Sequence, residues 1–287
     1  MSIVLQLVGN KFTITGSGNY LRTEEHNSLV IDLANDIFYW NSRSIVGDAY
    51  VWLTEVEGYT PTDAKEAIRN LDKGHQVFVS IKTAKGEDIC VYPKLVGIFW
   101  ENGKNNRDYW YKRGFTDDLI DRFQLGYTDG WYTIPIFMDG TFLNFQIRRD
   151  EPHKKILSWY RGVGGILFNS DILKMTSEVV ITESPTDAML LNGKGIPAVS
   201  HNGGAGYWNT AWFKYFMKQD KIYIAYDNDE AGRKGAIKVA KELGVYRCYT
   251  YTFSDYEAGY DVGDWVLHNF DKSFGQLLEE KARRIFE

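Results

Sequence analysis

Short apolar runs that end in carboxylates mark the second half of the chain. Residues 179–181 (V-V-I) lead into Glu183, and residues 222–226 (I-Y-I-A-Y) lead into Asp227 and Asp229. Buried parallel strands are short, apolar and rich in β-branched or aromatic residues, and their carboxyl ends face the ligand crevice of an α/β sheet. The pattern therefore predicts two parallel strands whose carboxyl ends bring these three acidic side chains together.

Helix-start signals follow both runs. Ser184 and Pro185 are a natural N-cap and first helical position, and Asp187 would lie in the first turn, close to the same strand end. Residues 230–243 are predicted as a further helix. Asp229 has two possible roles. It could belong to the acidic cluster, or it could simply cap this helix, because Asp-Asn-Asp after a strand can also be just a turn.

The four carboxylates point to a divalent cation. A strand-end Glu such as Glu183 is by itself usually a solvated surface residue, but its combination with Asp187, Asp227 and Asp229 is more specific. Converging carboxylates would repel one another in water, and a bound cation removes that cost. Because oxygen-rich carboxylate sites suit Mg²⁺ or Mn²⁺, we predict one of these ions as the cofactor.

The first third of the chain has the pattern of a small α/β unit. Residues 28–32 (S-L-V-I-D) and 36–40 (D-I-F-Y-W) predict a β-hairpin. Residues 49–56 predict a helix, and Pro61 opens another. Residues 89–99 are expected to form one strand between polar, Gly/Asn/Lys-rich loops.

The middle of the chain combines a helix, a hairpin and basic residues. Thr116 is a predicted N-cap, and residues 134–136 and 142–147 are predicted strands around the turn Asp139-Gly140. Further on, the Gly-rich run 201–206 predicts either a phosphate-approaching loop or a tight turn. Clustered basic side chains follow the hairpin: Arg148, Arg149, Lys155 and Arg161.

These elements predict a mixed α+β and α/β fold in three parts. Residues 1–105 would be an N-terminal domain with its linker, and residues 106–176 a basic subdomain. Residues 177–287 would be an α/β domain, with an amphipathic C-terminal helix over residues 262–287.

Composition narrows the class of protein. The 287 residues are 44% hydrophobic and 25% charged, an ordinary globular composition. The net charge of −5 means that binding to a polyanion would need a local basic patch and a metal. Two cysteines exclude a disulfide framework or a Cys-based zinc site, and favour a reducing, cytoplasmic setting. The sequence contains neither a signal peptide nor an apolar run of the roughly 20 residues that span a bilayer, so no membrane association is expected.

The acidic motifs resemble a known module. E-S-P-T-D (183–187) and D-N-D-E-A-G-R-K (227–234) resemble the two halves of the TOPRIM domain, most closely in bacterial-type (DnaG-type) and phage primases. The resemblance implies that Glu183, Asp227 and Asp229 hold catalytic metal. It also implies a third acidic position further on, which Asp261 fits, with Asp264 as its neighbour.

The basic segment extends this resemblance. R-G-F-T-D-D-L-I-D-R-F-Q-L-G-Y (113–127) and the later I-P-I and F-Q-I-R-R resemble the basic N-terminal part of the primase polymerase core. The resemblance implies that residues here hold the template strand and the incoming nucleotide, and the alternative is that they end a strand in solvent. Arg233 and Lys234, beside the acidic site, either contact nucleotide phosphate or balance the carboxylates. The implied set is Arg148, Arg149, Lys155, Arg161, Arg233 and Lys234.

The front of the chain resembles the zinc-ribbon domain of the same primases over residues 19–58. The positions that match the family's zinc ligands are Asn19, Arg22, Trp40 and Arg43, which are not a zinc-binding set. We therefore predict a zinc-ribbon-like domain without zinc, in which Trp40 fills the space of the metal. Arg22 and Arg43 either contact DNA phosphates or are merely solvated.

The resemblance implies a primase that makes short RNA primers on single-stranded DNA from ribonucleoside triphosphates. Metal-dependent attack on an α-phosphate needs no side-chain nucleophile. The sequence has no G-x-x-x-x-G-K-[ST] motif, so we expect the replicative helicase to be a separate protein. A compact primase with a zinc-free front domain is typical of phages or mobile elements acting in the host cytoplasm.

Two alternatives share these residues. A TOPRIM nuclease would use the same acidic cluster, although the primase-like segment 109–161 argues against it. A non-catalytic DNA-binding replication module that recruits a helicase would not need the acidic cluster. Replacing Asp227 and Asp229 by alanine separates these classes, because a pure binding role survives the change.

Overall fold

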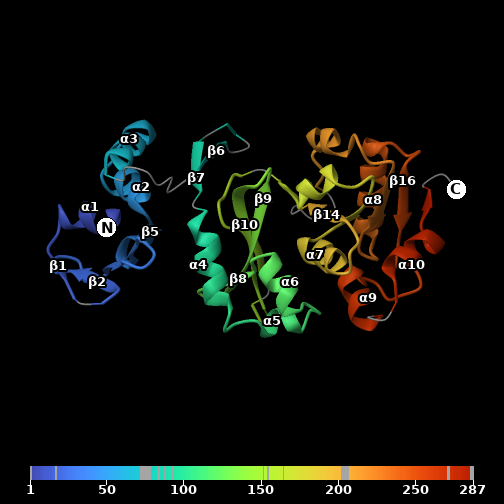
Figure 1. The fold of residues 1–287 in the computed structure, drawn as a ribbon, viewed down its shortest axis with the longest axis horizontal. Coiled ribbons are helices and arrows are strands. Elements are labelled where there is room, and N and C mark those ends of the chain that lie inside the picture. Colours follow the sequence, from blue (N-terminus) through green and yellow to red (C-terminus); the bar gives the residue numbers. More distant parts are fainter. Residues whose placement is uncertain are drawn as a thin grey trace. The chain divides into compact units, whose positions relative to one another are not determined.

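The computed structural model describes residues 2–16, 18–71, 79–82, 85–86, 88–91, 93–150, 152–153, 155–163, 165–201, 207–269 and 272–284. The chain forms two compact units, Met1–Gln76 and Val77–Glu287. Figure 1 shows the elements of each unit in sequence colours. The boundary that the sequence suggested near residue 105 falls inside the second unit.

The first unit is built on a five-stranded antiparallel sheet whose strands follow one another in chain order. The predicted hairpin is confirmed, since Leu29 pairs with Trp40 and Asp32 with Ile37. The strands are β1 (Ile14–Thr15), β2 (Tyr20–Thr23), β3 (Leu29–Asp32), β4 (Ile37–Trp40) and β5 (Ile45–Gly47). The helices are α1 (Ile3–Gly9), α2 (Ala49–Val51), a π-helical turn (Trp52–Val56) and α3 (Pro61–Leu71), with a 3₁₀ turn at Asn41–Arg43.

Trp40 is a core residue of this unit. Its side chain is 1% exposed and stacks on Trp52, with ring centroids 5.9 Å apart. Phe12 and His26 pack against it, with centroids 5.9 Å and 5.0 Å away. The Arg43 guanidinium lies 3.9 Å from the centroid of the same ring. Aromatic packing therefore orders the part of the sheet where the resemblance places a metal.

The other two positions matched to zinc ligands also make contacts within the unit. Arg22 donates from Nη1 to the carbonyl of Asn27 at 2.7 Å. The carbonyl of Asn19 accepts the Leu33 amide at 2.8 Å. The first contact lies in the turn between β2 and β3, and the second joins the residues that flank these two strands. The absence of zinc stays a prediction.

The second unit begins with small elements that pack on an antiparallel sheet. The predicted turn is confirmed, because Asp139 and Gly140 have φ angles of 52° and 70°, as two-residue hairpin loops require. The four-stranded sheet has the order β11-β10-β9-β8. Its strands are β8 (Gly126–Thr128), β9 (Trp131–Met138), β10 (Thr141–Arg149) and β11 (Lys155–Ser158), and a separate hairpin is formed by β6 (Val79–Lys82) and β7 (Asp88–Val91).

The single strand predicted over residues 89–99 is wrong. Strand β7 ends at Val91, and helix α4 (Lys94–Gly103) follows directly after Pro93. Proline lacks the amide that a ladder needs and suits the start of a helix, which explains the switch. Val96 and Phe99 then lie on one helical face and join the core of the four-stranded sheet.

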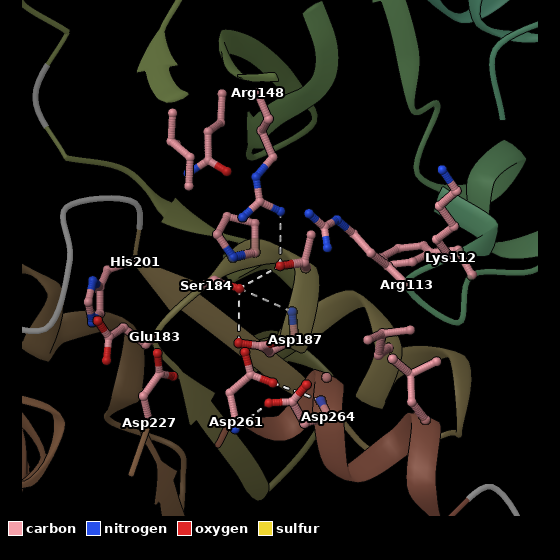
Figure 2. A pocket seen from close by; sticks show the side chains of 18 residues that line it. Lys112, Arg113, Arg148, Glu183, Ser184, Asp187, His201, Asp227, Asp261 and Asp264 are labelled. Carbon is pink, nitrogen blue, oxygen red and sulfur yellow. Dashed lines mark hydrogen bonds between the residues drawn. The ribbon is translucent and has the colours of Figure 1, made fainter. Parts of the chain in front are cut away.

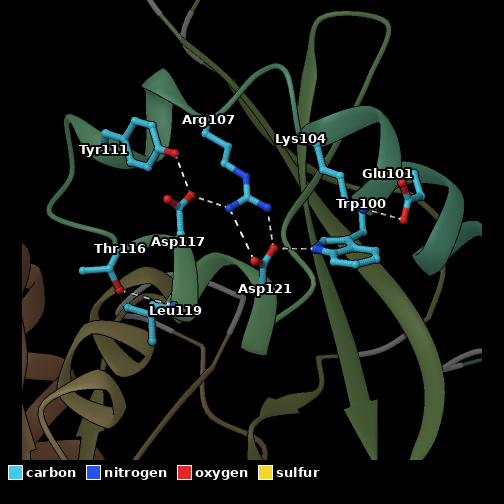
Figure 3. Close-up of polar contacts among 9 residues, drawn as sticks. All are labelled: Trp100, Glu101, Lys104, Arg107, Tyr111, Thr116, Asp117, Leu119 and Asp121. Carbon is cyan, nitrogen blue, oxygen red and sulfur yellow. Dashed lines mark hydrogen bonds and ion pairs between the residues drawn. The ribbon is translucent and has the colours of Figure 1, made fainter.

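A polar network ties α4 to the next two helices, α5 (Asp108–Tyr111) and α6 (Asp117–Arg122) (Figure 3). Arg107 bonds to the carboxylates of both Asp117 and Asp121. The hydroxyl of Tyr111 donates to Asp117 at 2.6 Å, and the indole of Trp100 donates to Asp121 at 2.9 Å. The predicted N-cap at the start of α6, Thr116, is confirmed.

A six-stranded sheet with the order β12-β14-β13-β15-β16-β17 forms the rest of the second unit. Its four central strands are parallel and its two edge strands are antiparallel. The mixed α/β class predicted from the sequence is thereby confirmed. The strands are β12 (Leu167–Phe168), β13 (Glu178–Thr182), β14 (Ala198–His201), β15 (Lys221–Ala225), β16 (Cys248–Tyr251) and β17 (Arg283–Arg284).

Both faces of this sheet are buried under helices. Along β13, Val180 packs into one core, and Val179 and Ile181 pack into the other. Alternate side chains of a strand point to opposite faces, so such a strand is apolar throughout. The first core includes α7 (Pro185–Gly193), α9 (Val262–His268) and α10 (Phe274–Lys281). The second includes α8 (Glu230–Leu243) and the 3₁₀ helices Ser170–Lys174 and Thr210–Phe216.

The predicted continuous helix over residues 262–287 is wrong. Helices α9 and α10 are separated, and the short strand β17 follows them. The side-chain amide of Asn269 donates from Nδ2 to the Trp265 carbonyl, and its Oδ1 accepts from Lys272. These contacts end helix α9. Ser273 then caps α10 by accepting from Gln276 at 3.3 Å. Two capping residues within a few positions break the helix despite its apolar periodicity.

Replacing Trp40 by alanine should destabilise the first unit by about 3–5 kcal/mol, because truncating a buried tryptophan leaves a cavity. Tyr20→Ala is the matched control on the same sheet, since Tyr20 is 64% exposed. Hydrogen exchange of the β3 and β4 amides measures the opening of this unit. Equal protection in the two variants would contradict the core role of Trp40.

Candidate active site

A cavity of about 560 Å³ opens at the carboxyl ends of β13 and β15. Figure 2 shows that acidic side chains gather on one wall and that Arg148 and Arg113 lie on the opposite wall. The acidic wall comes from the six-stranded sheet, α7 and the start of α9. Arg148 comes from β10, so the six-stranded and the four-stranded sheets supply opposite walls.

Three carboxylates converge on the acidic wall. Oxygen atoms of Asp187, Asp227 and Asp261 all lie within 4.8 Å of one another. Asp187 is in the first turn of α7, Asp227 follows β15, and Asp261 is the N-cap of α9. The structure thus brings together three of the five carboxylates that the sequence and the resemblance selected.

Burial and mutual repulsion hold protons on these groups. Burial, followed by the charges of Glu183, Asp261, Asp229 and Asp264, raises the pKa of Asp227 to about 7. Burial and the neighbouring Asp261 and Asp227 likewise raise the pKa of Asp187 well above its usual range. A hard divalent cation with oxygen ligands would relieve this repulsion, so the donor set fits Mg²⁺ or Mn²⁺.

Glu183 lines the cavity just beyond β13 but lies outside the group of three carboxylates. It is within electrostatic reach, because its charge raises the pKa of Asp227 and of Tyr226. Its predicted place at the end of the first strand is as observed, and its role as a ligand stays a prediction.

Asp229 caps helix α8. Its Oδ1 accepts the amide of Gly232 at 2.6 Å, and it is not among the residues that line the cavity. The capping interpretation of Asp229 is therefore confirmed, while its metal role stays a prediction. The close approach of this backbone requires glycine at position 232, because a Cβ there would lie 2.3 Å from the carbonyl oxygen of Asp227.

The E-S-P-T-D segment links the two walls through hydroxyl groups. Ser184 is the confirmed N-cap of α7 and donates from Oγ to Asp187 Oδ2 at 2.9 Å. Its hydroxyl lies 2.6 Å from that of Thr186, which accepts from Arg148 Nη1 at 3.1 Å. A chain of hydrogen bonds thus joins the Arg148 guanidinium to the Asp187 carboxylate.

Three basic residues line the cavity: Lys112, Arg113 and Arg148. Burial is the main cause that lowers the pKa of Arg148, whose Nε has no hydrogen-bond partner among the described residues. The Arg113 guanidinium lies 4.3 Å from the centroid of the Tyr109 ring. The sequence had not selected Lys112 or Arg113; their signal was the basic pair directly before the predicted helix at Thr116.

The other predicted basic residues lie outside the cavity lining. Arg149 has its guanidinium 4.3 Å from the centroid of the Trp131 ring. Lys155 and Arg161 are exposed. Arg233 donates to Asn228 at 3.3 Å, and the Nζ of Lys234 is 2.5 Å from a carboxylate oxygen of Glu230. Their roles in nucleotide or template binding stay predictions.

His201 also lines the cavity, where it is fully buried. Its Nε2 lies 2.8 Å from the hydroxyl of Tyr226, and burial lowers the pKa of His201 to about 4. The imidazole is therefore neutral near pH 7. The rest of the predicted Gly-rich loop, residues 202–206, is outside the described residues.

Sequence comparisons identify the acidic region. Residues 180–264 match the Toprim-like family model. The DNA primase of Halalkalibacterium halodurans is 29% identical over 260 residues, which cover 83% of this chain and 38% of that protein. The DNA primase of Thermotoga maritima is 21% identical, over 85% of this chain and 54% of that protein. The chain thus matches about half or less of the length of these two relatives.

Solved structures show the fold. The zinc-binding and RNA polymerase domains of the Aquifex aeolicus primase superpose with a TM-score of 0.55 at 16% identity, covering 99% of this chain and 84% of that chain. A DnaG primase catalytic domain bound to single-stranded DNA gives 0.54 at 17% identity, covering 66% and 79%. The fold and site define a TOPRIM-containing chain. Its predicted resemblance to the DnaG-type TOPRIM primases is confirmed in sequence and in fold.

Across the residues that the structure describes, every helix is too short or too polar to cross a bilayer.

Mn²⁺ binding should weaken about tenfold between pH 8 and pH 6, because Asp227, with a pKa of about 7, must lose its proton to bind a cation. Isothermal titration calorimetry at the two pH values measures the affinity.

Asp227→Asn is the control for this prediction. It removes one titrating group of the site and should lessen the change in affinity between the same two pH values. Equal affinities of the unchanged protein at both values would contradict the raised pKa of Asp227.

Proposed function

We propose that this chain is a primase, which synthesises short RNA primers on single-stranded DNA. The observation that carries the proposal is the single cavity with three converging carboxylates on one wall and Arg148 on the other. The matches to DNA primases in sequence and fold support it. Nucleotidyl transfer needs this pairing of a cation site with donors for phosphate oxygens.

Asp187, Asp227 and Asp261 are the proposed holders of Mg²⁺ or Mn²⁺, together with Glu183. Asp229 stays in the set because its charge contributes to the raised pKa of Asp227. When bound, the cation would lower the pKa of an attacking 3′-hydroxyl and neutralise charge on the triphosphate. Glu183, Asp227 and Asp229 are the proposed catalytic residues.

The basic wall would bind the phosphates of an incoming ribonucleoside triphosphate. Arg148 is half-buried and its guanidinium already donates to Thr186, so little rotamer freedom is lost when it pairs with an anion. Lys112 and Arg113 lie on the same cavity and would share this role. Arg149, Lys155 and Arg161 are proposed for the template strand, and Arg233 and Lys234 for nucleotide phosphate.

Several finer features belong to the same proposal. The template partner is supported by the similar fold of a DnaG primase catalytic domain bound to single-stranded DNA. A separate replicative helicase, a zinc-free front domain and a phage or mobile-element origin are proposed from the sequence.

Asp227→Asn should reduce primer synthesis by about a hundredfold or more, because the site loses charge that holds the cation near the reacting phosphate. Labelled ribonucleotide incorporation on mixed single-stranded DNA with Mg²⁺ or Mn²⁺ measures the activity. Products equal to those of the unchanged protein would contradict the proposal.

Two variants of Asp229 separate its possible roles. Asn caps helices as well as Asp, so Asp229→Asn keeps the cap and removes the charge, whereas Asp229→Ala loses both and costs about 1 kcal/mol. If Asp229 acts on the cation, both variants lose activity. If it only caps α8, Asp229→Asn stays active.

The same assay distinguishes the alternatives. Metal-dependent degradation of the template, lost in Asp227→Asn, would identify a TOPRIM nuclease. DNA binding without either activity, unchanged in an Asp227→Ala/Asp229→Ala variant, would identify a non-catalytic replication module.

A further inference from the structure

Asp261 reaches the acidic wall on an irregular segment. Residues 252–260 connect β16 to α9, and residues 254–259 are exposed. Phe253 and Tyr260 are buried and anchor the ends of this exposed stretch. The segment must hold Asp261 against two like charges, since Asp187 and Asp227 lie within 4.8 Å. Repulsion alone would move such a segment away.

Asn228, between the two aspartates of D-N-D, forms hydrogen bonds to this segment with both its backbone and its side chain. Its Nδ2 donates to the carbonyls of Tyr256 at 2.9 Å and Glu257 at 3.0 Å. Its backbone amide donates to the Tyr260 carbonyl at 2.9 Å, and its carbonyl accepts the Gly259 amide at 2.9 Å. Four hydrogen bonds therefore connect one residue to the segment that ends at Asp261.

The contacts match the chemistry of a carboxamide. Two donor hydrogens meet two carbonyls, and Oδ1 accepts from Arg233 at 3.3 Å. Asn228 is only 9% exposed, and losing its side-chain amide would remove the donor from two carbonyls of the segment. An aspartate there would offer the carbonyls no donors and would add another negative charge.

We propose that Asn228 is a positioning residue of the acidic site: it holds the segment 256–260 so that Asp261 and Asp227 can share one cation. The inference rests on the metal centre of the proposed function. Asn228 would act through the carboxylates and would touch neither substrate nor cation. The D-N-D motif then has a structural role for its middle residue as well as an acidic role for its first.

The test compares Asn228→Ala with a matched amide. Asn192 is 5% exposed and also donates from Nδ2 to two carbonyls, but these belong to Ala188 and Ala198 and not to the segment before Asp261. Asn228→Ala should weaken Mn²⁺ binding about ten- to a hundredfold, the effect typical of residues that orient metal ligands. Asn192→Ala should leave Mn²⁺ affinity within about twofold, even if it lowers thermal stability.

Hydrogen exchange in the absence of metal gives a second measurement. Peptides that cover residues 252–260 should exchange faster in Asn228→Ala than in Asn192→Ala. If Asn228→Ala does not fold, Asn228→Ser is measured in its place, because it retains one short donor and should give an intermediate affinity.

The outcomes separate the inference from the proposed function. Unchanged Mn²⁺ affinity in the Asn228 variant, or an equal loss in Asn192→Ala, would overturn the positioning role alone. No Mn²⁺ binding by the unchanged protein would overturn the metal centre and the inference with it. A third outcome combines two results: Asn228→Ala loses Mn²⁺ affinity while Asn192→Ala keeps it, and the unchanged protein makes no primers. This outcome would support the positioning role and overturn the primase proposal.

Discussion

The crowding of carboxylates at the carboxyl end of β15 is the constraint on which the rest of the second unit depends. Asp187, Asp227 and Asp261 come from three different elements and lie within 4.8 Å of one another, and burial together with neighbouring charges raises the pKa of Asp227. Asp187 and Asp261 are held by local hydrogen bonds. Ser184 caps α7 and binds Asp187, and Asp261 forms a capping box with Asp264. The scaffold therefore maintains a charge arrangement that a bound cation would relieve.

The second unit also separates acidic from basic side chains across one cavity. A chain with a net charge of −5 has no general attraction for a polyanion, so its basic groups must be placed. The four-stranded sheet supplies Arg148, and the turn between α5 and α6 supplies Lys112 and Arg113. The network of Arg107 with Asp117 and Asp121 joins the helices that flank this turn. Packing that looks purely structural thus sets the position of the basic wall.

Aromatic packing orders the centre of the front unit. Trp40 and Trp52 stack at the centre of a five-stranded sheet, and Arg43 lies over the Trp40 ring. Burying large aromatic side chains stabilises such a small unit through the hydrophobic effect.

The sequence by itself determined what depends on neighbouring residues: the strands before Glu183 and Asp227, the caps at Ser184 and Asp229, and the turn at Asp139-Gly140. Strand periodicity, capping and turn conformation are local properties of the chain. Only the tertiary structure decided which distant groups meet. It placed Arg148 in the cavity and its neighbour Arg149 on Trp131, because alternate residues of a strand face opposite sides. It also packed α4 against the four-stranded sheet, where Val96 and Phe99 join the core. The approach of Asp261 to Asp227 depends on contacts across more than one element, and no local pattern encodes such a distance.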